Sequence, residues 1–78
     1  METNQWEFRI NYTHKRDVLS NYHYYVCETA KEALKFQMEM IERKKWNIKI
    51  NTVERFDRFA DKWVDESFVI SEILSGNE

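Results

Sequence analysis

The residue types that most often carry catalysis or bind metals are scarce in this chain, which has one cysteine, Cys27, and two histidines, His14 and His23. A reactive thiolate–imidazole pair requires its two side chains within hydrogen-bond reach. His23 and Cys27 lie four residues apart in a segment that we predict to be extended, and this separates them by about 13 Å. Without carboxylates, one cysteine and two histidines also cannot form a standard structural zinc site. We therefore predict no catalytic and no metal-binding residue.

Motifs for phosphate binding and for acid–base catalysis are missing as well. The chain contains one glycine and no proline, which excludes a glycine-rich phosphate loop. Its grouped carboxylates, among them Asp57, Asp61 and Asp65, recur at intervals typical of the solvated face of a helix. We therefore predict that the protein is not an enzyme and binds no cofactor.

A length of 78 residues indicates a single small domain, residues 1–78. A chain this short buries a modest fraction of its surface, and one cysteine cannot form an intrachain disulfide. Aromatic residues make up 15% of the chain, so large side chains are available for dense packing. Self-association would add stability, and we expect a homodimer to be one of the partners.

The charge pattern excludes some partners. The formal net charge is −2 with both signs mixed, whereas a dedicated duplex-DNA binder usually carries a basic face. The N-terminal residues do not have the basic and apolar regions of a signal peptide, and no apolar stretch is long enough to span a membrane. We expect no membrane partner and a cytoplasmic location, which would be the host cytoplasm if the protein is encoded by a phage.

A helix over residues 29–46 is the most clearly marked element. Thr29 and Glu32 have the spacing of a capping box. Basic residues 43–45 suit the negative end of the helix dipole, and Asn47 can end the helix in a left-handed conformation. The apolar residues that form one stripe at helical spacing are Ala30, Ala33, Leu34, Met38 and Ile41.

Two strands precede this helix. The first is marked by apolar residues that alternate with polar ones, namely Trp6, Phe8, Ile10 and Tyr12. After a long polar loop, residues 21–27 form the second strand, and a β-hairpin results. One face of this strand has Tyr22, Tyr24 and Val26, and the other has His23, Tyr25 and Cys27. Both faces are largely aromatic or apolar, so either this strand is covered on both sides or one face binds a partner.

The C-terminal part allows two interpretations. Residues 47–51 indicate a short third strand. The apolar residues of 52–66 fall within an arc of roughly 140° on a helical wheel, which favours a second amphipathic helix. The alternative is a C-terminal hairpin with strands 47–58 and 62–71. The sequence thus predicts an α+β fold in which a small antiparallel sheet, opened by a β-hairpin, packs against the capped helix 29–46.

Our first hypothesis for function is a non-enzymatic protein-interaction module. The composition resembles that of small proteins carried by phages and mobile elements, which often act by binding a larger host complex, including defence complexes. We therefore expect an inhibitor or modulator of a larger cytoplasmic protein. The side chains that we predict to bind the partner lie off the apolar stripe of the first helix or on the acidic face of the second: Phe36, Met40, Arg43, Asp57, Asp61 and Asp65.

The alternative hypothesis is a protein that binds single-stranded nucleic acid or a small nucleotide. Strand aromatics can stack unpaired bases, and nearby basic residues can contact phosphates. The residues predicted for this role are Tyr22, His23, Tyr25, Lys15 and Arg16. The second strand lacks the glycine and the basic first residue of the known RNA-recognition strand motif, so nucleic acid is the less favoured partner.

Overall fold

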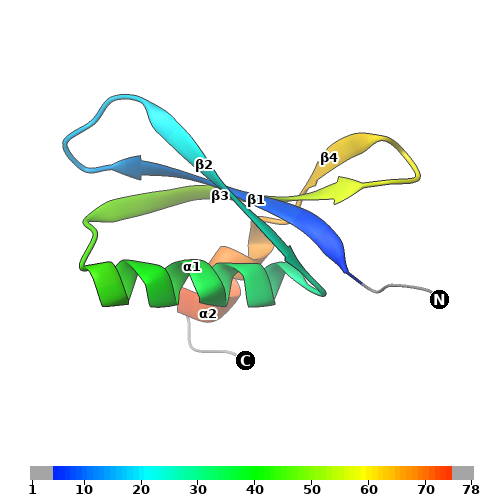
Figure 1. The fold of residues 1–78 in the computed structure, drawn as a ribbon. Helices are drawn as coiled ribbons and strands as arrows, with labels where there is room; N and C mark the ends of the chain where they lie inside the picture. The colour runs from blue at the N-terminus through cyan, green and yellow to red at the C-terminus, as the bar shows by residue number, and fades with distance from the viewer. Residues whose placement is uncertain (1–4, 75–78) are drawn as a thin grey trace.

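The computed structural model describes residues 5–74, which form a four-stranded sheet and two helices (Figure 1). The elements in chain order are β1 (Trp6–His14), β2 (Ser20–Cys27), α1 (Ala30–Lys44), β3 (Ile48–Asp57), β4 (Lys62–Asp65) and α2 (Phe68–Leu74). The predicted α+β class is confirmed, and so is the opening hairpin. No helix within the described residues is long and apolar enough to cross a membrane.

The strand order is β2-β1-β3-β4, and every neighbouring pair is antiparallel. Helix α1 connects the edge strand β2 to β3 on the other side of β1. Both helices lie on the same side of the sheet, and no described helix covers its other face (Figure 1). This asymmetry decides which side chains of each strand are buried.

Helix α1 begins as predicted. The Thr29 hydroxyl accepts a hydrogen bond from the Glu32 amide at 3.1 Å, while the Glu32 carboxylate accepts from the amide of Glu28. The helix ends at Lys44, and the C-cap residue in the left-handed conformation is Lys45, with φ of 55°, rather than Asn47. Its amide donates to the carbonyl of Ile41, which satisfies one of the free carbonyls at the helix end.

The core lies between α1, α2 and the covered face of the sheet. Phe8, Ile10 and Val53 point from β1 and β3 toward the helices and are fully buried. Ala33 and Leu34 of α1 pack against them. The remaining members of this core cluster are Cys27, Ala30 and Val69.

The second amphipathic helix predicted over 52–66 is wrong. The alternative hairpin is present as β3 and β4, but its second strand ends at Asp65 and not at residue 71, because α2 begins at Phe68. The apolar spacing was misleading because the apolar residues of 52–66 lie on both faces of this hairpin, and a β-bulge just before that segment breaks the alternation of β3. Asn11 pairs with Thr52 but Tyr12 pairs with Ile50, which leaves Asn51 as an extra residue in β3. Its side-chain amide donates to Asn11 Oδ1 at 2.9 Å and to Thr13 Oγ1 at 2.8 Å. The extra residue lets Ile50 and Val53 face the same side of the sheet, and this mimics a helical period.

The turn between β3 and β4 forms without glycine. The Asp57 carboxylate accepts from the amides of Phe59 and Ala60, and Asp61 adopts a φ of 55°. Asp and Asn tolerate this left-handed conformation better than other non-glycine residues. After β4, the Ser67 hydroxyl donates to the carbonyl of Val53 and accepts from its amide, which anchors the start of α2 to β3.

Leu34→Ala is expected to destabilise the domain by about 2–5 kcal/mol, because Leu34 is 1% exposed and its truncation leaves a cavity between α1 and the sheet. Urea unfolding followed by circular dichroism measures this change. The matched control is Phe68→Ala, at a side chain that is 61% exposed and should change stability by less than about 0.5 kcal/mol. Equal effects of the two substitutions would contradict the core described above.

Candidate functional site

The face of the sheet opposite the helices is the candidate site. Strand register places alternate residues of all four strands on it. The aromatic and apolar side chains of this open face are Tyr22, Tyr24, Val26, Phe56 and Trp63. Tyr24 and Val26 remain 62% and 63% exposed, so this part of the sheet is neither core nor an ordinary polar surface.

Arg9 occupies the centre of the open face. Its Cζ atom lies 4.7 Å from the ring centroid of Tyr22 and 4.3 Å from that of Trp63. The Tyr24 and Trp63 rings approach each other with centroids 6.3 Å apart, although they come from the two edge strands of the sheet. Phe56 packs edge-on against Trp63, with centroids 5.2 Å apart. A guanidinium flanked by rings on both sides is a cation–π arrangement that holds the aromatic side chains in place.

Glu54 neutralises this half-buried cation. The Nε atom of Arg9 donates to Glu54 Oε1 at 2.7 Å, and both side chains are 23% exposed. The hydrogen bond that Arg9 donates to Glu54 is the main reason why the pKa of Arg9 lies above its ordinary value. The Arg9 guanidinium therefore stays charged at any physiological pH.

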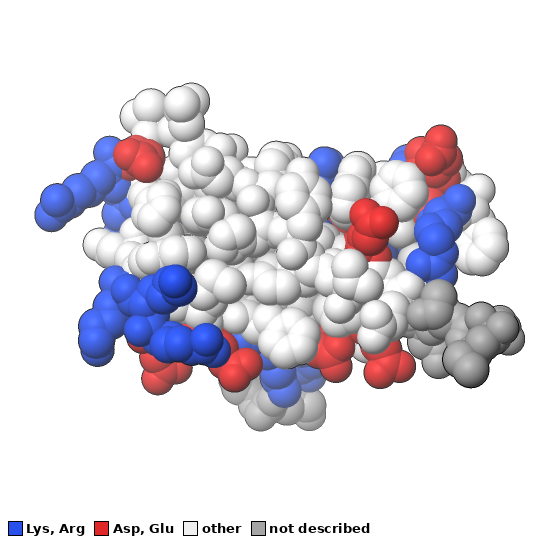
Figure 2. All heavy atoms as spheres, in the orientation of Figure 1, with Lys and Arg blue, Asp and Glu red and all other residues white. Residues whose placement is uncertain are grey.

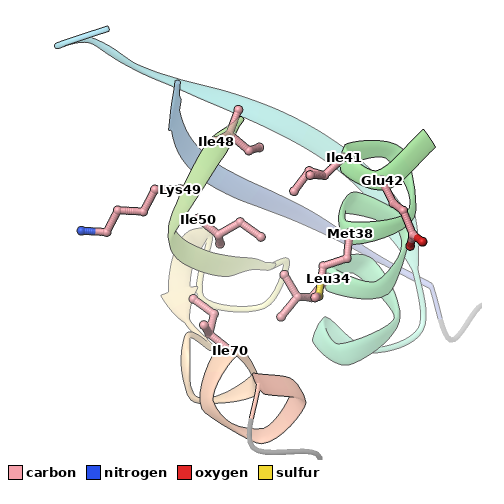
Figure 3. A pocket seen from close by; sticks show the side chains of 8 residues that line it. All are labelled: Leu34, Met38, Ile41, Glu42, Ile48, Lys49, Ile50 and Ile70. Carbon is pink, nitrogen blue, oxygen red and sulfur yellow. The ribbon is translucent and has the colours of Figure 1, made fainter. Parts of the chain in front are cut away.

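The open face as a whole is close to neutral. Besides the Arg9–Glu54 pair, the strand register places the carboxylates of Glu7 and Asp65 and the ammonium group of Lys49 on the open face. Lys49 points away from the helix side of β3 in Figure 3. Carboxylates thus outnumber basic groups here, and the face is not the basic groove that backbone phosphates require.

Two of the residues predicted to stack bases lie on the other side of the sheet. His23 and Tyr25 are half-buried and point toward α1, where Gln37 Oε1 accepts from the Tyr25 hydroxyl and, at 2.8 Å, from His23 Nδ1. Tyr22 is on the open face and is 42% exposed. Within the described residues, Gln37 Nε2 is buried without a hydrogen-bond partner. The structure therefore separates Tyr22 from His23 and Tyr25, and they do not form one stacking surface.

The predicted basic contacts, Lys15 and Arg16, are exposed in the loop after β1. Arg16 is seven residues from Arg9, which corresponds to about 20 Å along an extended chain. This loop therefore lies beyond the end of the aromatic cluster. A contact of Lys15 or Arg16 with phosphates stays a prediction.

The residues predicted to bind a partner fall into two groups. Phe36, Met40 and Arg43 are on α1, on the helix side of the sheet. The Phe36 ring stacks on Tyr25 with centroids 6.2 Å apart and is still 44% exposed. Met40 is half-buried and Arg43 is exposed in the last turn. Their role in partner binding stays a prediction, and their position makes them a surface distinct from the open face.

The three aspartates do not share a helix face, because the predicted second helix is a hairpin. Asp57 ends β3 and holds the turn, and hydrogen bonds from the Ala60 and Phe59 amides lower its pKa. Asp61 is within the turn. Asp65 ends β4 and accepts from the amide and hydroxyl of Ser67. Asp57 and Asp65 therefore have structural roles, and binding of a partner by these residues stays a prediction.

A groove on the helix side offers a second concave surface (Figure 3). Its volume is about 530 Å³, within the range of small-molecule sites. Its lining comes from α1, β3 and α2: Leu34, Met38, Ile41, Glu42, Ile48, Lys49, Ile50 and Ile70. The interior is aliphatic, and its two charged residues do not form a set that could orient or activate a substrate. The groove therefore offers apolar contact but no evident chemistry.

The cysteine has no reactive environment. Cys27 is 2% exposed, and its thiol lies 3.4 Å from the carbonyl oxygen of Thr29 as a hydrogen-bond donor. Burial raises the pKa of this thiol from 9.0 to about 11. Among the residues that the structure describes, no three of the His, Cys, Asp and Glu side chains are grouped to hold a metal ion.

Comparisons of the chain with protein-family models, with curated proteins and with solved structures found no match. The functional proposal therefore rests on the geometry of the open face. Sequence reasoning placed Tyr22, Tyr24 and Val26 on one strand face but did not find Arg9 or Trp63. Arg9 could have been found from its position in the middle of β1, whereas residues 62–65 do not alternate and gave no local signal for Trp63.

We expect Cys27 to react slowly with a thiol-specific disulfide reagent in the folded protein and rapidly in urea. The raised pKa keeps the thiol protonated, and the protonated form stabilises the fold fully below pH 9.0, with this contribution lost as the pH rises through about 11. Reaction rates at mildly alkaline pH with and without urea measure the effect. A native rate equal to that of the unfolded chain would show that the site is open.

Proposed function

We propose that the protein is a non-enzymatic interaction module that binds a larger partner protein through the open face of its sheet. The single observation that carries this proposal is the cluster of Tyr22, Tyr24 and Trp63 around Arg9. Trp, Tyr and Arg are the residue types that dominate binding energy at protein interfaces. Because the Arg9–Glu54 pair already fixes the rings, little side-chain entropy would be lost on binding.

The charge of the open face suggests the chemistry of the partner surface. The exposed rings and Val26 suit an apolar centre, and the carboxylates of Glu7 and Asp65 suit basic residues at its rim. An inhibitor that covers a basic functional surface of its target would need an apolar centre with acidic residues at its rim. Inhibition or modulation of a larger cytoplasmic complex of the host, in the manner of small phage proteins, is the role that we propose, with support from composition and from this pattern.

Binding of single-stranded nucleic acid is the second candidate function, and the exposure of Tyr22 and Tyr24 is the observation that favours it. The excess of carboxylates on the open face is the argument against it. Fluorescence polarisation with labelled RNA and DNA oligomers over a salt series distinguishes the two functions. Tight binding that weakens steeply with added salt would favour nucleic acid and contradict the protein-binding proposal.

Tyr24→Ala is expected to abolish partner capture without unfolding the domain, because the side chain is 62% exposed and lies over Trp63. The measurement is affinity capture from a host extract followed by mass spectrometry, with melting by circular dichroism as the check on folding. Phe68→Ala removes an equally exposed ring from α2 and serves as the matched control.

The proposal requires proteins that are captured by the wild type and the Phe68→Ala variant and are lost with Tyr24→Ala. The same captured set with all three proteins would contradict a binding role for the open face. Loss with the α2 control alone would move the binding site to the helix side.

A further inference from the structure

We propose that two copies of this chain pair through β2 and α1, so that their sheets join into one eight-stranded sheet around a two-fold axis. This inference does not depend on the proposed function. It starts from the difference between the two edges of the sheet. Strand β4 has four residues, two of them charged, Lys62 and Asp65, whereas β2 has eight residues and no charge.

An edge strand such as β2 is rarely left open in a monomer. Its outward backbone groups have no strand beside them in the described residues, since β2 pairs only with β1. Natural sheets protect their edges with charges, prolines, bulges or short strands, and β2 has none of these. The sequence of β4 shows that this chain uses such protection where an edge remains free.

The flank of α1 beside β2 continues this surface. Phe36 stacks on Tyr25 of β2 and leaves 44% of its surface exposed, and Met40 lies one turn further along the same flank. Figure 2 shows an uncharged area across the middle of the face above α1, while Lys and Arg side chains gather at the C-terminal end of that helix. Strand edge and helix flank together form one strip, which is apolar at Phe36 and Met40 and also contains the exposed Glu39.

Charge complementarity identifies a second copy as the occupant. Glu32 is in the first turn of α1 and Arg43 in its last turn, on the same flank as Phe36 and Met40. A two-fold axis between Phe36 and Met40 makes the two α1 helices antiparallel. Each Phe36 then meets Met40 of the second copy, and each Glu32 meets Arg43 of the second copy.

The same two-fold axis also pairs the β2 strands of the two copies. Gln37 contacts both His23 and Tyr25, so the middle of α1 lies level with Tyr24. The axis that pairs the helices therefore places Tyr24 beside Tyr24 of the second copy and Tyr22 beside Val26. Antiparallel pairing of two β2 strands has this symmetry without any change of register.

The contact is large enough for a specific dimer. A 15-residue helix is about 22 Å long and an eight-residue strand about 26 Å. Over these lengths the α1 flank and the β2 edge each present a surface about 10 Å deep. Together they bury roughly 500 Å² on each copy. The total of about 1,000 Å² reaches the lower bound for biological interfaces.

Sedimentation equilibrium over a concentration series is the first test. The wild type should reach twice the 9.6 kDa mass of the chain. Phe36→Lys should remain folded and become monomeric, because two ammonium groups would face the apolar part of this strip across the axis. The matched control Phe68→Lys, at an exposed ring of α2, should stay dimeric. A monomeric wild type at every concentration, or a folded Phe36→Lys dimer, would overturn the proposal.

Cross-linking tests the register even if Phe36→Lys fails to fold. Tyr24→Cys with a short bis-maleimide should give a covalent dimer in high yield, because the two cysteines would face each other across the axis. Lys62→Cys on the β4 edge is the control and should remain monomeric, while Cys27 is buried and should not react. Equal cross-linking at both edges, or none at Tyr24→Cys, would contradict pairing through β2.

Discussion

Burial of one face of the sheet under a single layer of helices is the constraint on which the rest of this structure depends. Phe8, Ile10 and Val53 are fully buried because Ala33 and Leu34 of α1 pack over them. The residues that the structure describes, 5–74, contain no further helix for the opposite face. The sheet must therefore remain stable with half of its side chains in contact with water, and the sequence of each strand reflects that requirement.

The open face meets this requirement through Arg9. A guanidinium between the Tyr22 and Trp63 rings covers their faces and is itself neutralised by Glu54. The aliphatic and planar parts of such a side chain shield apolar surface while its charge stays hydrogen-bonded. A polar cluster of this kind makes the face stable in water without hiding its aromatic residues, and Tyr24 in particular stays exposed. The cluster around Arg9 thus both stabilises the free protein and keeps aromatic side chains exposed for binding.

Local sequence signals were sufficient for half of the fold. Alternation identified β1, the aromatic and β-branched residues identified β2, and the Thr29 cap identified the start of α1, because each of these signals depends on neighbouring residues. The region 52–66 failed because its apolar residues lie on both faces of the hairpin, and because one extra residue, Asn51, breaks the alternation of β3 just before it. A bulge is stabilised by contacts with another strand, here Asn11 and Thr13, and no local period reveals it. The helical interpretation placed Asp57 and Asp61 on the solvated face of a helix. In the structure they form the turn between β3 and β4.

The candidate site was less predictable than the fold for a related reason. Both faces of β2 are aromatic, and only the position of α1 decides that His23 and Tyr25 bond to Gln37 while Tyr22 and Tyr24 lie exposed on the open face. Trp63 reaches Arg9 from a distant part of the chain, after the bulge has set the register of β3 and the turn has set that of β4. The site is thus a consequence of tertiary pairing. Which of its aromatic residues are exposed became clear only once the covered face of the sheet was known. The unprotected edge of β2 is a further consequence of helices that pack on one face of the sheet only.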